Sequence, residues 1–385
     1  MVGLLIIIYI VFISLGLPDS LFGVAWPVVH VEFGVFEQFA SFYSIIIGIC
    51  SGGVSFLAGR LIRKFGTGRV TFVSTLLTVV GMLGMSFAPN LIVMMLFAVI
   101  MGYGAGAIDT GLNSFVSLHY EARHMNWLHC FWGVGVTISP MIMSLFLKDG
   151  AGSWRGGYRV IAALQLLIAL IVLFTLKKWN VEKLPQTTDA KAAPNKGLLA
   201  LLRAPGVITS IVTLGLYCAG EFTVGTWGAF YAVDVFAVTP DVAAMWVSLY
   251  YGGIMVGRML SGFLSIKLSD DTLIFGGMGL AALGMVILAL PLGSFSLCGL
   301  LLVGVGFGPV FPCVLHSIPL RFGGDYAADI TGYHMGGAYG IGFAIQLAYG
   351  YIAAATTFAI TPFVLLLLCT GVLVAMTHTR RVTNI

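Results

Sequence analysis

Charged residues are scarce in this sequence. Asp, Glu, Lys and Arg together make up 9% of the 385 residues, whereas 59% are hydrophobic and the mean hydropathy is +1.02. A soluble domain typically contains about 25% charged residues. So few charges cannot cover a surface that faces water, and an ordinary soluble protein is therefore excluded. The formal net charge of +4 gives no support for nucleic acid binding, and an all-α integral membrane protein is expected.

Motifs for metal, disulfide and nucleotide chemistry are also missing. The sequence has no CxxC and no Cys/His cluster, so neither a disulfide framework nor a zinc site is indicated. It has no GxxxxGK[ST] loop for ATP, and no nucleophile–base constellation that indicates an enzyme. No cofactor and no metal are expected. The cysteines all lie inside apolar segments: Cys50, Cys130, Cys218, Cys298, Cys313 and Cys369.

What the sequence does contain is long hydrophobic runs. A helix that spans a membrane needs roughly 20 apolar residues. Twelve such segments begin near Gly3, Gln38, Arg69, Leu91, Met125, Gly157, Gly206, Asp241, Thr272, Phe295, Tyr326 and Thr357. The runs are continuously apolar instead of alternating, which favours helices over the strands of a β-barrel. The first run has no basic region before it and continues past Trp26, so it is expected to be a retained helix.

The basic residues predict the orientation of these segments. Loops on the cytoplasmic side of a membrane are enriched in Lys and Arg. If the N-terminus is cytoplasmic, only Lys148, Arg155 and Arg159 fall in outer loops, while almost all other basic residues fall in inner loops or the C-terminal tail. Both termini are therefore expected in the cytoplasm.

One long polar segment interrupts the hydrophobic pattern. KKWNVEKLPQTTDAKAAPNK, residues 177–196, has the charge and proline content of a linker. It predicts an N-terminal six-helix bundle over 1–176, a cytoplasmic linker over 177–205 and a C-terminal six-helix bundle over 206–385.

The two predicted bundles share short motifs. MGYGAGAI (101–108) and VGVGFGPV (303–310) have the pattern Gly-x-Gly-x-Gly at an offset of 202 residues. LHCFWGVG (128–135) aligns with YHMGGAYG (333–340), which pairs His129 with His334. Asp19 and Glu221 are also 202 residues apart. Several matches at nearly the same offset indicate an internal duplication.

Three acids lie deep within the hydrophobic segments: Asp19, Asp109 and Glu221. A carboxylate at the centre of a spanning helix costs about 2.5–3.5 kcal/mol, and such residues are usually functional. Burial favours the neutral form of a carboxyl group, so Asp19 and Asp109 are predicted to carry protons. Pro18 favours a kink beside Asp19. The alternative for Asp109 is a structural ion pair with Arg258, which lies at a similar depth.

Other polar and aromatic residues of these helices are candidates for solute contacts. His129 lies near Asn126 and Trp132 along one helix, and His334 is its counterpart in the second half. A packing role is the favoured interpretation for His334. Aromatic rings stack against the apolar faces of sugars while polar groups bind the hydroxyls. The full set predicted to bind solute is His129, Asn113, Trp132, Trp26, Glu221, Asn126 and His334.

These motifs resemble the major facilitator superfamily and, within it, the fucose permease-like sugar–proton symporters. GAGAIDTGLNSFV (104–116) is similar to the helix-four pattern of that group. The resemblance implies that Asp109 and Asp19 carry the coupled proton and that His129 and Trp132 occupy positions of sugar contacts. GRLIRKFGTGRV (59–70) is similar to the signature loop of the superfamily, which implies a gating role for its basic residues and glycine: Arg60, Arg63, Lys64, Gly66 and Arg69.

The sequence therefore predicts a monomeric twelve-helix transporter of the inner membrane. A proton gradient would move a small polar solute, with a monosaccharide favoured, by alternating access between the two bundles. A proton-driven efflux antiporter for amphipathic compounds and an uncoupled sugar facilitator are the alternatives within this fold. A membrane-embedded enzyme and a sensor that does not transport are the alternatives outside it.

Overall fold

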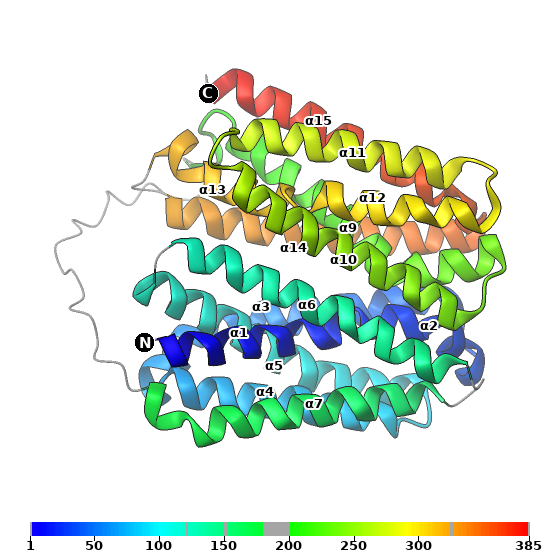
Figure 1. The fold of residues 1–385 in the computed structure, drawn as a ribbon, viewed down its shortest axis with the longest axis horizontal. Helices are drawn as coiled ribbons and strands as arrows, with labels where there is room; N and C mark the ends of the chain where they lie inside the picture. The colour runs from blue at the N-terminus through cyan, green and yellow to red at the C-terminus, as the bar shows by residue number, and fades with distance from the viewer. Residues whose placement is uncertain (1, 121, 149–152, 180–200, 324–326, 384–385) are drawn as a thin grey trace. The chain divides into compact units, whose positions relative to one another are not determined.

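The computed structural model describes residues 2–120, 122–148, 153–179, 201–323 and 327–383. Within these ranges the secondary structure is helical and contains no strand. Figure 1 shows the helices running along one common direction in each part of the chain. This confirms the predicted all-α class.

The helices of the first half begin with α1 and end before the polar segment. They are α1 (Val2–Asp19), α2 (Leu21–Phe33), α3 (Ala40–Phe65), α4 (Thr67–Ser86), α5 (Leu91–His119), α6 (Ala122–Leu147) and α7 (Trp154–Phe174). A short 3-10 turn, η2 (Leu176–Trp179), follows α7.

The helices of the second half follow residue 206. They are α9 (Val207–Phe236), α10 (Pro240–Leu264), α11 (Asp270–Ala289), α12 (Cys298–Phe307), α13 (Val310–Phe322), α14 (Ala327–Ala355) and α15 (Thr361–Thr383). Short 3-10 turns precede α3, α12 and α15: η1 (Glu37–Phe39), η3 (Gly293–Leu297) and η5 (Phe358–Ile360).

Each predicted hydrophobic segment corresponds to a helix or to a pair of helices in line. Eleven segments of the described chain are long and apolar enough to cross a membrane, and two of these combine α1 with α2 and α12 with α13. The remaining predicted segment is α10, a helix of 25 residues that contains Arg258. The chain is a multi-pass membrane protein.

Pro18 interrupts the first spanning segment, as the sequence predicts. A proline has no N–H, so the backbone oxygen four residues earlier loses its helical donor. In the structure this oxygen belongs to Ser14, and it accepts a hydrogen bond of 2.5 Å from the side-chain amide of Gln165 on α7. Helix α1 ends one residue after Pro18, at Asp19, and α2 begins at Leu21. The break is stable because a neighbouring helix satisfies the freed oxygen.

The chain forms two compact units. Unit 1 comprises Met1–Glu182 and Gly225–Gly252, and unit 2 comprises Lys183–Val224 and Gly253–Ile385. Helix α9 begins in unit 2 and ends in unit 1, whereas α10 begins in unit 1 and ends in unit 2. The predicted division at residues 176 and 206 therefore stays a prediction, and the predicted linker lies mostly outside the described residues.

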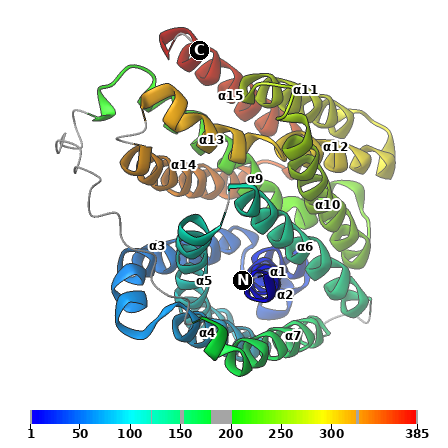
Figure 2. The ribbon, with the colours of Figure 1, turned by 60° about the vertical axis from the view of Figure 1, so that its left-hand side comes forward.

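Helix α1 is the central element of unit 1. Figure 2 looks nearly along this helix and shows α4, α5, α6 and α7 around it. Its side chains Ile8, Val11 and Phe12 are almost completely buried and belong to one hydrophobic cluster with residues of α5, α6 and α7. A polar group on α1 therefore lies within the bundle and not at its edge.

The glycine repeat packs in the same way in both halves. A Cβ atom on Gly104 would lie 2.6 Å from the backbone oxygen of Ser74 on α4, and its counterpart Gly306 approaches the backbone of α11 even more closely. Gly106 faces the backbone of α3, and its counterpart Gly308 faces that of α10. In each half, alternate glycines thus allow two different neighbours to approach one helix. The shared geometry supports the internal duplication.

Candidate functional site

Asp19 lies at the break between α1 and α2, in the middle of the first spanning segment. Its side chain is exposed although Pro18 and Ser20 on either side are buried. One carboxylate oxygen, Oδ2, accepts a hydrogen bond of 2.8 Å from the indole Nε1 of Trp132 on α6. Two of the predicted site residues, from segments more than a hundred residues apart, therefore meet in unit 1.

Glycine contacts hold α1 and α6 together next to this pair. A Cβ on Gly16 would lie 2.9 Å from the backbone nitrogen of Val136, and one on Gly135 would collide with the backbone oxygen of Ile13. The hydroxyl of Ser20 also donates to the backbone oxygen of Val136, at 3.0 Å. The two backbones are thus in direct contact, and this contact sets the distance between Asp19 and Trp132.

Asp109 lies on α5 and is half-buried. The side-chain amide of Asn113, one helical turn later, donates to the carboxylate Oδ1 at 2.8 Å and to the backbone oxygen of Asp109 at 2.9 Å. Next to it, the hydroxyl of Thr110 donates to Ser55 on α3 at 2.8 Å. The predicted solute contact Asn113 is thus hydrogen-bonded to the predicted proton carrier Asp109. The predicted ion pair of Asp109 with Arg258 stays a prediction.

The remaining candidates of unit 1 are found in different environments. His129 is half-buried, and its ring meets Phe12 edge-on with centroids 6.0 Å apart. Trp26 has no exposed surface, and its indole nitrogen donates to the backbone oxygen of Glu37 at 2.8 Å. A buried indole with its only donor engaged favours a packing role for Trp26. The side chain of Asn126 lies outside the described residues.

The candidates of unit 2 are buried. Glu221 and Arg258 are 8% and 9% exposed, and their side chains form an ion pair of 3.8 Å between α9 and α10. His334 is completely buried, and its ring nitrogens lie 2.8 Å from the backbone oxygen of Ile330 and 2.7 Å from the hydroxyl of Ser210. These contacts favour the packing interpretation of His334. They also give Glu221 a charged partner that the sequence analysis did not assign to it.

The signature loop predicted over 59–70 comprises the end of α3, Gly66 and the start of α4. Its basic residues are all exposed: Arg60, Arg63, Lys64 and Arg69. Gly66 ends α3 with φ at +82°, a conformation that residues with a Cβ rarely adopt. Two residues later, Gly68 packs directly under the ring of Trp179, which is 6% exposed. Sequence reasoning missed this contact, in which the start of the polar segment is fixed to the signature loop.

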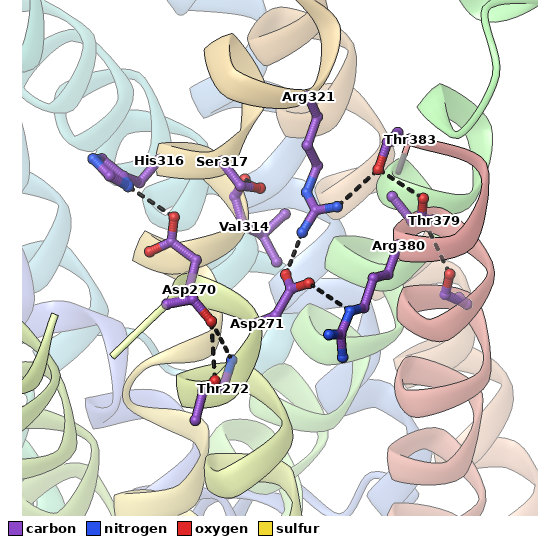
Figure 3. Close-up of polar contacts among 12 residues, drawn as sticks. Asp270, Asp271, Thr272, Val314, His316, Ser317, Arg321, Thr379, Arg380 and Thr383 are labelled. Carbon is purple, nitrogen blue, oxygen red and sulfur yellow. Dashed lines mark hydrogen bonds and ion pairs between the residues drawn. The ribbon is translucent and has the colours of Figure 1, made fainter. Parts of the chain in front are cut away.

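A second polar cluster, in unit 2, was also missed. Figure 3 shows Arg321 of α13 and Arg380 of α15 pointing at the carboxylate of Asp271 at the start of α11. Arg321 also donates to the hydroxyl of Thr383 at 2.9 Å, and the neighbouring Asp270 lies 2.8 Å from His316. In the sequence, SGFLSIKLSDD (261–271), which ends in these two acids, is a weak second-half counterpart of the signature motif GRLIRKFGTGRV (59–70).

Among the residues that the structure describes, no group of three or more His, Cys, Asp or Glu could hold a metal ion. The six cysteines form no disulfide with one another, and four of them are buried.

The family model of the Major Facilitator Superfamily matches residues 8–347. The chain therefore belongs to this superfamily, which confirms that it is not an enzyme. Among solved structures it is similar to the transporter FucP in its outward conformation, with a TM-score of 0.68, 17% identity and 98% of each chain covered. At this identity the similarity shows the fold.

The similarity to curated proteins covers a smaller share of this chain than the similarity to FucP does. A putative glucose/galactose transporter of Helicobacter pylori is 26% identical over 58% of this chain and 58% of its own length. The glucose/mannose transporter GlcP of Bacillus subtilis is 23% identical over 73% of this chain and 69% of its own. The chain spans less than two thirds of the length of the first curated relatives that it matches.

Proposed function

We propose that this protein is a proton-coupled secondary transporter of a small polar solute, with a monosaccharide as the favoured class. The names of the Helicobacter pylori and Bacillus subtilis relatives support a sugar. The solved structure of a D-xylose–proton symporter, which shares the fold with a TM-score of 0.76, supports the same class of transport.

The observation that carries the proposal is the exposed carboxylate of Asp19 in the middle of a spanning segment. An acid within a membrane helix is costly and is retained where it lines a water-filled path or binds an ion. Its hydrogen-bond partner is the neutral indole of Trp132, at 2.8 Å. Asp109, similarly, is hydrogen-bonded to the neutral amide of Asn113. A neutral donor thus lies beside each carboxylate, which supports the proposed role of Asp19 and Asp109 in binding protons.

The solute contacts are assigned to the half-buried side chains near Asp19. His129 and Trp132 offer imidazole and indole groups from the same helix, α6, and Asn126 is placed with them by sequence. Trp26, Glu221 and His334 stay predictions as solute contacts, and all three are buried. The basic residues of the signature loop, with Gly66, would control its opening towards the cytoplasm.

The proposed placement follows the distribution of basic residues. We place the protein in the cytoplasmic (inner) membrane as a monomer, with both termini in the cytoplasm. Its two bundles, 1–176 and 206–385, would alternate about a solute site at the middle of the membrane, with residues 177–205 as the cytoplasmic linker.

Transport in proteoliposomes tests the proposal. Labelled glucose, galactose, xylose and fucose are offered with and without an inward proton gradient. The wild type should accumulate at least one of them only with the gradient. Asp109→Asn and Asp19→Asn should lose accumulation but keep exchange of labelled for unlabelled solute, because exchange requires no net proton movement. Asp234→Asn, an exposed acid near the end of α9, is the matched control.

Two outcomes would point elsewhere. Accumulation by Asp109→Asn would remove this residue from proton coupling, and equilibration without dependence on the gradient would indicate an uncoupled facilitator. Expulsion of dyes with no sugar uptake would favour the efflux antiporter. One relative, 23% identical over 67% of this chain, is named quinolone resistance protein NorB, from Staphylococcus aureus.

A further inference from the structure

The signature loop has little buried surface of its own. Helix α3 ends at Phe65, Gly66 makes the turn, and α4 begins at Thr67. Among residues 63–69, only Gly68 is buried. The body of α4 packs against α5 and α7, so it is the loop and the first turn of α4 whose position depends on what covers Gly68.

The side chain of Trp179 covers Gly68. A Cβ atom on Gly68 would lie 2.6 Å from the Cγ atom and 2.7 Å from the Cβ atom of this tryptophan, which is 6% exposed. Both atoms lie close to the tryptophan backbone, so the contact fixes the short turn η2 as well as the ring. A residue larger than glycine fits at position 68 only if Trp179 moves away.

Apolar contacts hold the indole in this position. Trp179 belongs to the buried cluster that includes Ile8 of α1 and Phe115 of α5, and its ring centroid lies 5.9 Å from that of Phe115. Its indole nitrogen is buried and has no hydrogen-bond partner among the residues that the structure describes. Hydrophobic contacts are not directional, so the indole can leave and return without breaking a hydrogen bond to this part of the chain.

The turn that carries Trp179 continues directly from α7. The backbone nitrogen of Lys178 donates to the backbone oxygen of Thr175 at 2.8 Å, and the hydroxyl of Thr175 donates to the backbone oxygen of Ile171 at 2.6 Å. Trp179 thus joins the end of α7 to the signature loop, and the first residues of the polar segment belong to unit 1.

We propose that Trp179 is a positioning residue for the signature loop. While the indole covers Gly68, the loop and the first turn of α4 keep one position, and the loop moves only when the indole leaves. This inference rests on the proposed function, in which the loop controls the opening towards the cytoplasm. It deepens that function by assigning part of the control to a residue of the polar segment.

Hydrogen exchange of the purified protein tests the contact without any solute. Backbone amides of residues 67–71 and 176–179 should exchange about tenfold faster in Trp179→Ala than in the wild type, because both segments can then open locally. Gly68→Ala should have the same effect, since its Cβ displaces the indole. Trp179→Phe should stay close to the wild type, because phenylalanine keeps the Cβ and Cγ atoms that meet Gly68.

The double variant and a control complete this test. Gly68→Ala with Trp179→Ala should exchange no faster than the faster single variant, because both substitutions break one contact. Trp127→Ala, at an exposed position of α6, should leave both segments unchanged. Unaltered exchange of residues 67–71 in Trp179→Ala would overturn the proposal. An equal increase along all helices of unit 1 would also overturn it, since Trp179 would then be a general packing residue.

Exchange of labelled for unlabelled solute in proteoliposomes tests the role in gating. Because helix and loop movements often limit turnover, the maximal rate should fall by about fivefold or more in Trp179→Ala and Gly68→Ala. The half-saturating concentration should stay within about twofold of the wild type, since neither residue belongs to the proposed solute site. Trp179→Phe should recover most of the rate. Wild-type rates in both variants, with the loop shown to be open, would refute the gating role.

The two tests separate the inference from the proposed function. If no sugar is transported but the exchange of residues 67–71 follows Trp179, the solute class is wrong and the positioning of the loop stands. If the wild type transports with a proton gradient but the loop ignores Trp179, the function stands and the role of Trp179 is wrong.

Discussion

The acid of α1 and the acid of α9 occupy matching positions in the two halves and have opposite surroundings. Asp19 is exposed and receives a hydrogen bond from a neutral indole. Glu221 is 8% exposed and is paired with the guanidinium of Arg258. Between unit 1 and unit 2, the sequence position of the acid is kept and its electrostatic environment is not.

The difference shows how one ancestral position can serve two purposes. The second half joins its acid to an arginine in a buried ion pair, and removing either member would leave the other as a buried charge. The proton role of Asp19 in the first half stays a proposal.

The largest expected effect is on the ion pair of Glu221 and Arg258. Arg258→Met leaves Glu221 as a buried charge without its guanidinium, and breaking a buried pair in this way costs about 3–5 kcal/mol. The unfolding free energy in detergent, measured by denaturant titration, should fall by this amount. Adding Glu221→Gln should recover most of the loss, because the double variant has no buried charge. A single variant as stable as the wild type would show that the pair is not buried in the protein.

The next effect compares two arginines that share one carboxylate. Arg321 is 2% exposed and Arg380 is 59% exposed, and both contact Asp271. Arg321→Met should destabilise unit 2 by about 3 kcal/mol, the lower end for a buried pair, because Arg380 remains. Arg380→Ala should cost at most about 1 kcal/mol, since exposed pairs contribute little. Thermal unfolding of the two variants side by side measures the contrast, and equal shifts would refute it.

The smallest effect concerns a glycine pair of the two halves. Gly135 and Gly340 align in the repeat, but a Cβ on Gly135 meets the backbone of α1, whereas nothing lies within 4 Å of one on Gly340. Gly135→Ala should cost about 1–3 kcal/mol as an overpacking substitution. Gly340→Ala should be neutral. The same unfolding measurement applies, and a harmless Gly135→Ala would mean that α1 and α6 are not in backbone contact.

Much of the fold was predictable because it depends on local composition. Each continuous apolar run became a helix, and Pro18 ended α1 one residue later because it removes a backbone donor. The spacing of the glycines predicted the duplication, since close helix contacts require small residues at regular positions.

The partners of the polar residues were not predictable in this way. No sequence spacing indicates that Gln165 satisfies Ser14, that Trp132 reaches Asp19 or that Trp179 covers Gly68. Each contact joins helices that are distant in the chain, and their rotation about their own axes decides which side chains meet. The same holds for Trp26, which was predicted to contact solute and is completely buried.

The sequence by itself determined the class of protein, the number of spanning segments and the presence of acids within them, because each of these depends on hydrophobicity along the chain. Only the tertiary structure decided which acid is exposed and which is paired with an arginine. Asp19 and Glu221 are equivalent in the repeat, but α6 supplies an indole to the first and α10 supplies a guanidinium to the second.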